Sequence, residues 1–350
     1  MVESKTYIAT PPGATIKEQL SDRGITQKEF AARMDMSEKH ISRLINGEVH
    51  LTPEVAERLE YVLGIPASFW NKLESIYREK LAKAKDENKM DEDISFSKKI
   101  PYKEMSKLGW VPKTSNLKER VVNLRKFFEV ARLTSVTNKR ITRIAWRKLG
   151  SSKKSDYALM AWAQQAKIEA RKMEVSPINL QGLFEEIPQL REMTRQEPEK
   201  FCPALVDLMA RHGIALVFLP HLGGSFLHGA TFYDGGKIVM GLTVRGAYAD
   251  RFWFSLFHEL GHIHYGQIGK DDALTSEDEE KADLFARDRL ISLVDYQTFV
   301  QNGDFSSRAL SSAADHMGID VGILVGRLQK ENIIPYSKGN QLKKKYSLSA

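Results

Sequence analysis

The residues best suited to chemistry lie in one short run, His258-Glu259-Leu260-Gly261-His262. On a helix, residues four apart lie about 40° apart around the axis and roughly 6 Å apart along it. Both imidazoles would therefore occupy one face, where they could hold one Zn²⁺. Glu259 directly follows the first histidine and would be close enough to act on a zinc-bound water. The pattern predicts a zinc site with hydrolytic chemistry, in which Glu259 is the general base.

A catalytic zinc site of this kind needs a third protein ligand and leaves the fourth position to water. The next helical stretch contains Glu279 and Asp283, which are four residues apart and share one helical face. We assign Glu279 as the third ligand. We assign Asp283 as the hydrogen-bond acceptor that fixes the tautomer of a zinc-bound histidine. Glu277 and Glu280 remain competing candidates for the ligand.

A core helix must carry the motif, and the residues before it fit that role. Phe252-Trp253-Phe254 and Leu256-Phe257 are apolar, and Gly261 leaves room for a second helix to approach closely. The structural alternative is an amphipathic helix whose histidines are merely half-buried. The agreement between the motif and its helical context favours the metal site.

Short strands are expected just before the motif helix. Apolar runs and turn residues predict strands at 214–219, 229–233 and 237–243, with a hairpin at Asp234-Gly235-Gly236. In zinc peptidases a substrate chain commonly adds to a sheet edge beside the metal helix. We predict residues 237–243 for that role. His264 and His228 are available as oxyanion donors, although a plain core or surface role is the simpler interpretation of both.

The N-terminal part of the chain predicts two short helices joined by a tight turn. Thr26 with Glu29 forms a capping-box signature, Ser37 caps the second helix, and Ile41 and Leu44 face inward. Such a pair describes a helix-turn-helix. The outward side chains are hydrogen-bond donors suited to phosphates and base edges: Gln27, Lys39, His40, Ser42 and Arg43. The alternative is a plain helical bundle with a solvated charged face.

Composition limits the classes of protein that are possible. A chain of 350 residues, 42% of them hydrophobic, predicts two or three domains with sizeable cores. No apolar run approaches the ~18–20 residues of a membrane span, and no signal peptide is recognisable. Cys202 is the single cysteine, which excludes an internal disulfide and a cysteine-rich zinc site. We expect a cytoplasmic protein without membrane contact, and the net charge of +7 favours nucleic acid as a partner.

The segment TQKEFAARMDMSEKHISRLINGEVHLTPEVAERLEYVLGIPASFW resembles the Cro/C1 (XRE) helix-turn-helix, and specifically HigA-type antitoxins. The LTPEVAERLEYVLG and FW stretches narrow the resemblance to that branch. It implies binding to double-stranded DNA at a palindromic operator, as a homodimer. Asp35 stands where the family usually has Gly in the turn, but Asp tolerates a left-handed backbone. The resemblance implies DNA contacts from Gln27, Lys39, His40 and Arg43, assisted by Ser37 and Ser42.

The run from GIALVFLP through RFWFSLFHELGHIHYG to EEKADLFARDRLI resembles the ImmA/IrrE family of metallopeptidase-like domains. The later stretch MGIDVGILVGRLQKENIIP matches closing helices typical of the same group. The resemblance implies zinc held by His258, His262 and Glu279. In this family the third ligand is a Glu three residues before an Ala-Asn/Asp pair, and that pattern falls on Glu279 before Ala282-Asp283.

The expected fold class is multidomain and mainly α. We predict an all-α helix-turn-helix bundle at 1–83, a charged linker at 84–100, a helical connecting region at 101–200, and an α+β zincin-like metallopeptidase domain with a small sheet at 201–350. Lys343-Lys344-Lys345 is expected to be a loose, solvated tail.

Two functions are compatible with these expectations. The first is a DNA-binding transcriptional regulator with a zinc-dependent endopeptidase that cleaves a protein substrate, which could be a repressor, a toxin or the chain itself. The alternative is an antitoxin or repressor of a toxin–antitoxin-like system, in which the peptidase fold senses a partner or a metal without catalysis. The presence of Glu259 favours the enzyme, because pure zinc sensing does not require that carboxylate.

Overall fold

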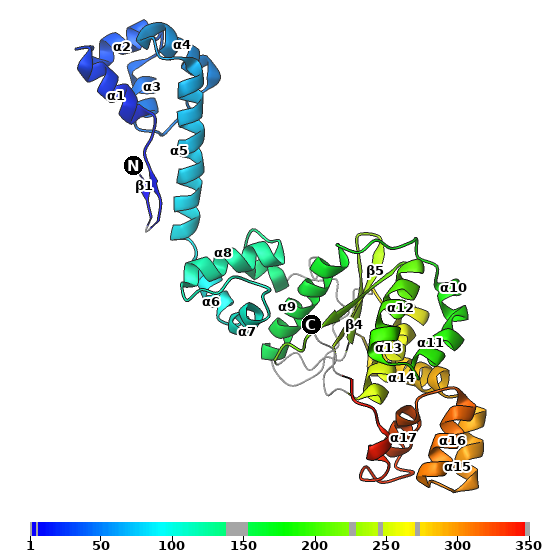
Figure 1. The fold of residues 1–350 in the computed structure, drawn as a ribbon. Helices are drawn as coiled ribbons and strands as arrows, with labels where there is room; N and C mark the ends of the chain where they lie inside the picture. Colours follow the sequence, from blue (N-terminus) through cyan, green and yellow to red (C-terminus); the bar gives the residue numbers. More distant parts are fainter. Residues whose placement is uncertain are drawn as a thin grey trace. The chain divides into compact units, whose positions relative to one another are not determined.

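The computed structural model describes residues 2–4, 6–137, 153–223, 229–243, 248–269 and 274–346. The chain divides into two compact units, Met1–Ser95 and Phe96–Ala350. Helices predominate in the described residues of both units, and the larger sheet is a small one of three strands (Figure 1). The mainly helical fold class is therefore confirmed. None of the described helices combines the length and the apolar character that crossing a membrane requires.

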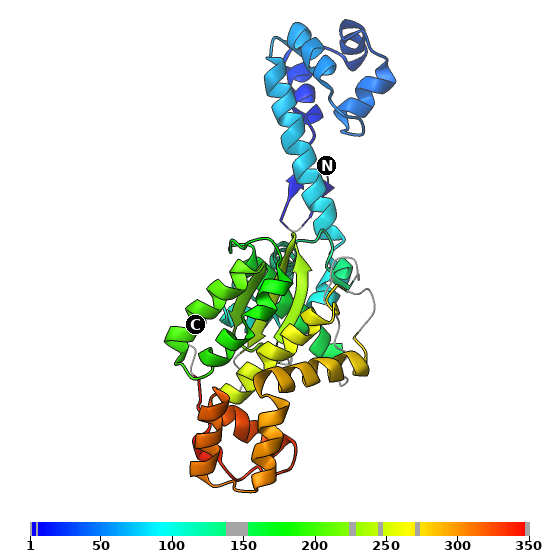
Figure 2. The same cartoon turned by 90° about the vertical axis from the view of Figure 1, so that its right-hand side faces the viewer.

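The N-terminal unit is a helical bundle with a short two-stranded ribbon. Its core is made by apolar side chains such as Phe30, Ile41, Leu59 and Trp70. The ribbon packs along the last and longest helix of the unit, as Figure 2 shows in blue and cyan. The elements are β1 (Val2–Glu3), β2 (Ile8–Ala9), α1 (Gly13–Asp22), α2 (Gln27–Arg33), α3 (Glu38–Ile45), α4 (Pro53–Leu63) and α5 (Ala67–Asn88).

Side-chain caps set the starts of α2 and α3. The hydroxyls of Thr26 and Ser37 accept hydrogen bonds from the backbone N–H groups of Glu29 and His40, both at 3.2 Å. These caps confirm the predicted starts of α2 and α3, because they satisfy N–H groups that the helix itself leaves unpaired. The Glu29 side chain pairs with Arg33 at 2.6 Å.

The segment predicted as an exposed charged linker, residues 84–100, is largely helical. Helix α5 continues to Asn88, and α6 (Asp91–Ser97) follows almost at once. The Glu87 carboxylate, which is 6% exposed, accepts hydrogen bonds from the hydroxyls of Ser4 and Thr6 in the N-terminal ribbon. The boundary between the two units, after Ser95, falls within this segment, but the predicted exposure is wrong at Glu87, because the ribbon docks on the end of α5 and gives that carboxylate partners.

The C-terminal unit is built around the sheet of β3 (Ile214–Leu219), β4 (Gly229–Asp234) and β5 (Lys237–Thr243). The strand order is β3-β5-β4, with β3 parallel and β4 antiparallel to β5. The β4–β5 hairpin turns at Gly235 and Gly236, whose φ angles are 57° and 83°. Such positive φ values favour glycine in a two-residue hairpin turn. The three predicted strands and the hairpin are confirmed.

Helices cover both faces of this sheet (Figure 1). Residues Leu216 and Met240 face a core shared with α12 (Pro198–Arg211) and α13 (Ala249–His264). The opposite face contacts α9 (Lys153–Ala170), where a Cβ on Gly241 would come within 2.5 Å of the Trp162 ring. Residues 101–200 were predicted as a region apart from the sheet domain. In the structure they supply one of its covering helices, because Gly241 admits a tryptophan from α9.

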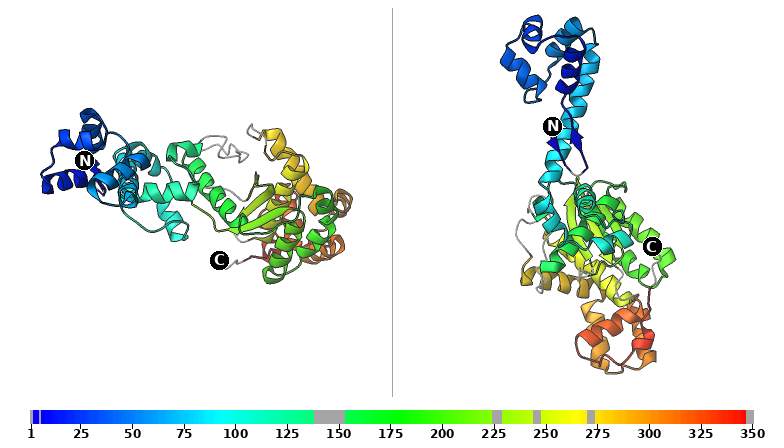
Figure 3. Two further views of the ribbon diagram at one scale, coloured as in Figure 1. Left: turned by 90° about the horizontal axis from the view of Figure 1, so that it is seen from above. Right: turned by 90° about the vertical axis from the view of Figure 1, so that its left-hand side faces the viewer.

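The remaining described helices complete the C-terminal unit. Helix α14 packs on α13, and α15, α16 and α17 gather at one end of the unit, coloured orange to red in Figure 3. The helices of this unit not yet given are α7 (Tyr102–Lys107), α8 (Leu117–Phe128), α10 (Leu180–Glu185), α11 (Ile187–Met193), α14 (Ser276–Leu290), α15 (Leu293–Asn302), α16 (Ser307–Met317) and α17 (Val321–Lys330). Short 3₁₀ turns lie at Leu133–Thr137 and Asn340–Leu342.

The lysine-rich stretch near residue 344 is not a loose tail. The Lys343 ammonium lies 2.7 Å from the Asp250 carboxylate, and both side chains are about nine-tenths buried (11% and 10% exposed). The backbone N–H of Ala249 donates to the carbonyl of Lys344 at 3.0 Å. The Trp253 indole donates to the hydroxyl of the buried Tyr346 at 2.9 Å. Residues 343–346 therefore close over the start of α13, and the prediction of a solvated tail was wrong.

Candidate metal centre and nucleic-acid interface

Helix α13 presents its two histidines from a buried position. His258 and His262 are 5% and 4% exposed. Helix α14 crosses α13 closely at Gly261, where an added Cβ would lie 2.9 Å from the Cα of Ala282. The glycine thus permits the close approach that the sequence predicted, and that approach brings the Glu279 side chain of α14 over the histidine pair.

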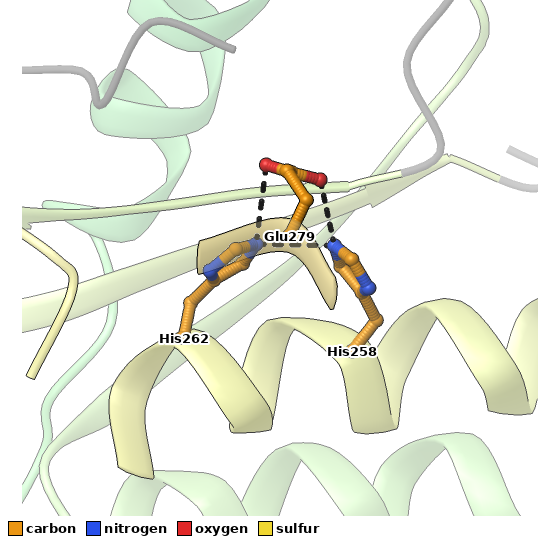
Figure 4. A group of neighbouring side chains, drawn as sticks. All are labelled: His258, His262 and Glu279. Carbon is orange, nitrogen blue, oxygen red and sulfur yellow. Dashed lines mark hydrogen bonds and ion pairs between the residues drawn. The ribbon is translucent and has the colours of Figure 1, made fainter. Parts of the chain in front are cut away.

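Three possible ligand atoms converge at this crossing (Figure 4). The Nε2 atoms of His258 and His262 are 3.0 Å apart. The Glu279 carboxylate oxygens lie 3.5 Å from Nε2 of His258 and 3.7 Å from Nε2 of His262. All three ligand atoms fall within 4.8 Å of one another. Two imidazole nitrogens and a carboxylate oxygen form a donor set that suits a catalytic zinc ion with an open fourth position.

The competing carboxylates point elsewhere. Glu277 is exposed and pairs with Lys281 at 2.6 Å, and Glu280 is exposed to solvent. Of the three candidates for the third ligand, Glu279 is the one that the structure brings to the histidines.

The second ring nitrogen of each histidine, Nδ1, has a hydrogen-bond partner that fixes the orientation of the ring. The Asp283 carboxylate lies 2.7 Å from Nδ1 of His258, as expected from the sequence. The Gln267 carbonyl oxygen lies 2.7 Å from Nδ1 of His262, and the Gln267 amide donates to Asp278 at 3.0 Å. A hydrogen on each Nδ1 leaves the Nε2 lone pairs directed at the metal position. The contact from Gln267 could not be predicted from the sequence, because no known motif requires a glutamine at that distance from the second histidine.

The electrostatics around His258 favour a positive charge. Burial opposes the imidazolium, but hydrogen bonds to Asp283 and Glu279 and the nearby charge of Glu259 outweigh it. Together they raise the pKa of His258 to about 9. Burial also opposes ionisation of Asp283, yet its bond to His258 and the Lys330 charge lower the pKa of that carboxyl. A cluster that attracts a proton in this way is also suited to a divalent cation.

Glu259 is oriented by strand β4. Its Oε2 accepts a hydrogen bond from the Thr231 hydroxyl at 2.6 Å, and both side chains are buried. A Cβ on Gly229 would come within 2.9 Å of the Glu259 Oε1 atom. One carboxylate oxygen of Glu259 is therefore held by the Thr231 hydroxyl. The other lies beside the backbone of Gly229, which has no side chain. Both Thr231 and Gly229 lie in a strand predicted from the sequence, but no sequence signal assigned either residue to the site.

The strand predicted to receive a substrate is not an edge strand. Residues 237–243 form β5, which pairs with β3 on one side and β4 on the other. That prediction was wrong because β3, which comes earlier in the chain, pairs in parallel with the edge of β5 that β4 leaves open. Within the described residues, β4 pairs on one side only, and it also contacts α13.

The proposed oxyanion donors receive no support. The His264 ring packs against Phe184 and Phe285, with ring centroids 4.8 and 4.9 Å away. Burial and the nearby Arg289 lower its pKa. This environment suits a packing role. His228 lies outside the described residues.

In the N-terminal unit, α2 and α3 form the helix-turn-helix pair. Asp35 occupies the turn with φ of 51°, the left-handed conformation expected from its position. The Arg58 guanidinium of α4 donates to the carbonyls of Met34 and Asp35 at 2.8 and 3.0 Å. These bonds satisfy carbonyls that the end of α2 leaves unpaired, and they tie the turn to α4.

The predicted DNA-contacting side chains differ in exposure. Gln27, Ser37, Lys39 and Arg43 are exposed, whereas His40 and Ser42 are half-buried. Among the described residues, the His40 Nε2 atom is shielded from solvent and has no hydrogen-bond partner. Arg43 makes a surface ion pair with Glu48 at 3.6 Å. The DNA contacts themselves stay predictions.

Comparison with known proteins identifies the N-terminal unit as a helix-turn-helix domain, since residues 16–70 match the helix-turn-helix family model. An uncharacterized HTH-type transcriptional regulator, YddM of Escherichia coli (strain K12), is 35% identical over 66 residues, which cover 19% of this chain and 70% of the relative. The chain belongs to the helix-turn-helix family of DNA-binding transcriptional regulators. The HigA and ImmA/IrrE resemblances stay predictions.

Proposed function

We propose that the chain is a DNA-binding regulator whose C-terminal unit is a zinc-dependent endopeptidase. Its substrate would be a protein, namely a repressor, a toxin or the chain itself. The observation that carries the proposal is the convergence of His258, His262 and Glu279 beside a buried, oriented Glu259. A purely structural histidine pair would not need a third donor and a separate general base at the same place.

When bound, Zn²⁺ would lower the pKa of a water molecule and polarise a peptide carbonyl. His258, His262 and Glu279 would hold it. Glu259 would accept the proton of the attacking water on Oε1 and deliver it to the leaving amine nitrogen, while Thr231 keeps Oε2 in place. The substrate chain would align along β4, whose strand contacts α13 and whose second edge lacks a partner among the described strands.

The DNA-binding half would place α3 in a major groove of double-stranded DNA. Gln27, Lys39 and Arg43 are exposed and suited to phosphates and base edges. A homodimer belongs to the proposal because a palindromic operator presents two half-sites. In its support, Phe69 and Ile76 form an exposed apolar stripe on α5 that a second copy could cover.

The test is zinc content per chain, by elemental analysis, of tag-free wild type, Glu279→Ala and Glu259→Gln. We expect about one zinc in wild type and in Glu259→Gln, and much less in Glu279→Ala. Cleavage of a protein encoded beside this chain should be lost in Glu259→Gln. Wild type that binds no zinc after reconstitution would overturn the enzyme. Zinc binding with no cleavage, and a Glu259→Gln variant that represses normally, would favour the non-catalytic antitoxin or repressor.

A further inference from the structure

A chain of hydrogen bonds leads from His262 to the first turn of α14. The Nδ1 atom of His262 lies 2.7 Å from Oε1 of Gln267, and Nε2 of Gln267 lies 3.0 Å from Oδ1 of Asp278. His262 and Gln267 are only 4% and 2% exposed. Because water has little access to these two side chains, their protein neighbours determine which of their atoms donate hydrogen bonds and which accept them.

The end of α13 holds Gln267 in this position. The backbone N–H of Gln267 donates to the carbonyl of His262 at 2.9 Å, and Gly266, with a φ of 60°, reverses the chain just before it. A residue in the left-handed conformation commonly follows the end of a helix, and it is usually glycine. The Gln267 side chain is thereby brought back to the ring of His262.

Asp278 lies in the first turn of α14, directly before the candidate metal ligand Glu279. Its Oδ2 atom accepts hydrogen bonds from the backbone N–H and the hydroxyl of Thr275 at 3.0 and 2.9 Å, as part of the capping box of this helix. Its Oδ1 atom faces the Gln267 amide. One carboxylate therefore contacts both the start of the helix that supplies Glu279 and the side chain that contacts His262.

This carboxylate determines the orientation of the Gln267 amide. An ionised carboxylate has no hydrogen to donate, so the NH₂ group of Gln267 must face Asp278. The amide oxygen then faces His262 and can only accept, so the hydrogen of a neutral His262 ring must lie on Nδ1. The Nε2 lone pair is left for a metal. A reversed amide would place two oxygens against each other and move the ring hydrogen to Nε2, where it would block coordination.

We propose that Asp278 is a positioning residue of the metal centre: through Gln267 it sets the tautomer in which His262 can bind a divalent cation. The inference deepens the proposed function and rests on it, because zinc is the ion that this tautomer would serve. It gives Asp278 a role beyond capping α14, since the cap uses Oδ2 and the contact with Gln267 uses Oδ1.

The first test exchanges the amide and the carboxylate. In Asp278→Asn the Thr275 N–H still requires the side-chain oxygen, so the new NH₂ group faces Gln267, whose amide reverses and moves the His262 hydrogen to Nε2. The double variant Asp278→Asn/Gln267→Glu again places an oxygen at the ring and has the net charge of wild type. Proton–nitrogen correlation spectra of the histidine rings in the metal-free full chain, assigned with His262→Gln, report the tautomer. We expect Nδ1–H in wild type and the double variant, and Nε2–H in Asp278→Asn.

The second test is zinc affinity, measured by competition with a chromophoric chelator. It should fall ~10–100-fold in Asp278→Asn and recover in the double variant. Glu277→Gln is the matched control for charge, because Glu277 lies in the same turn of α14, is exposed and pairs with Lys281. Thr275→Ala is the control for the cap, because it removes the capping hydroxyl and leaves Asp278 beside Gln267. Both controls should bind zinc as wild type does.

The outcomes separate this role from the proposed function. A His262 hydrogen that stays on Nδ1 in Asp278→Asn, or a double variant that binds zinc as weakly as Asp278→Asn, would overturn the role of Asp278 while the zinc site stands. An equal loss of zinc affinity in Glu277→Gln or Thr275→Ala would also overturn it, because charge or capping would then explain the loss. Failure of wild type to bind zinc would overturn the proposed function, and the tautomers of the metal-free chain would still show whether Asp278 positions His262.

Discussion

Replacement of Gly261 by alanine should separate the two helices that form the candidate metal centre. The added Cβ would lie 2.9 Å from the Cα and 3.1 Å from the carbonyl oxygen of Ala282, and 3.2 Å from the Cβ of Phe285. Carbon atoms prefer separations of ~3.5–4.0 Å. Because two of these neighbours are backbone atoms, no side-chain rotation relieves the contact. Helix α14 must move away by roughly half an ångström.

The sign of the stability change follows from two opposing effects. Alanine is favoured over glycine inside a helix by ~1 kcal/mol. Overpacking a well-packed core costs typically ~1–3 kcal/mol. We therefore expect Gly261→Ala to lower the free energy of unfolding by up to about 2 kcal/mol. The shift of α14 also carries Glu279 away from His258, and metal sites tolerate only ~0.2 Å. Zinc affinity should fall about tenfold, which corresponds to ~1.4 kcal/mol.

Two measurements check this prediction. Urea unfolding of the chelator-treated protein reports the stability, and competition with a chromophoric chelator reports the zinc affinity. Ser255→Ala, in the same helix, is the control, because its hydroxyl only donates to the Arg251 carbonyl. A Gly261→Ala protein that is more stable than wild type and binds zinc equally well would refute the close crossing at Gly261.

Three further predictions concern other parts of the chain. Lys343→Met leaves Asp250 buried without its cation and should lower the free energy of unfolding by ~3 kcal/mol in urea titrations; a loss below about 1 kcal/mol would contradict the buried pair. Because the pKa of His258 rises from 6.5 to about 9 on folding without metal, its protonation stabilises the fold fully below pH 6.5, and this contribution is lost as the pH rises through 9. The melting temperature of chelator-treated protein should therefore fall over that range, and Asp283→Asn should flatten the fall. Lys39→Ala should weaken operator binding and reduce the slope of log affinity against log salt by about 1; an unchanged slope would remove Lys39 from the phosphate contacts.

Local signals made much of this structure predictable. The caps at Thr26 and Ser37, the turn at Asp35 and the hairpin at Gly235 each depend on a few neighbouring residues, and all four are found, although the Glu29 carboxylate pairs with Arg33 instead of completing a capping box with Thr26. The histidine pair could be placed on one face for the same reason, since the period of one helix fixes their spacing.

The wrong and missing predictions from the sequence concern contacts between segments that lie far apart in the chain. Thr231 meets Glu259 only because β4 packs beside α13, and strand order cannot be read from a hairpin signal alone. Glu87 and Lys343 occur in charged runs typical of solvated segments, yet each has a partner far away in the sequence. A run of charged residues predicts an exposed segment only when no polar or oppositely charged group from a distant part of the chain can pair with those residues.

The closure of residues 343–346 over the start of α13 imposes an order of events during synthesis. Domains fold as units, N-terminal first, while the ribosome adds roughly 5–20 residues per second. The helix-turn-helix unit has all its residues once Ser95 has emerged. Helix α13 is synthesised much later, and Asp250 and Trp253 lack their partners, Lys343 and Tyr346, until nearly the whole second unit has emerged. Each new molecule thus becomes competent to bind DNA before its candidate metal centre is fully packed, and a prematurely terminated chain would keep the first property without the second.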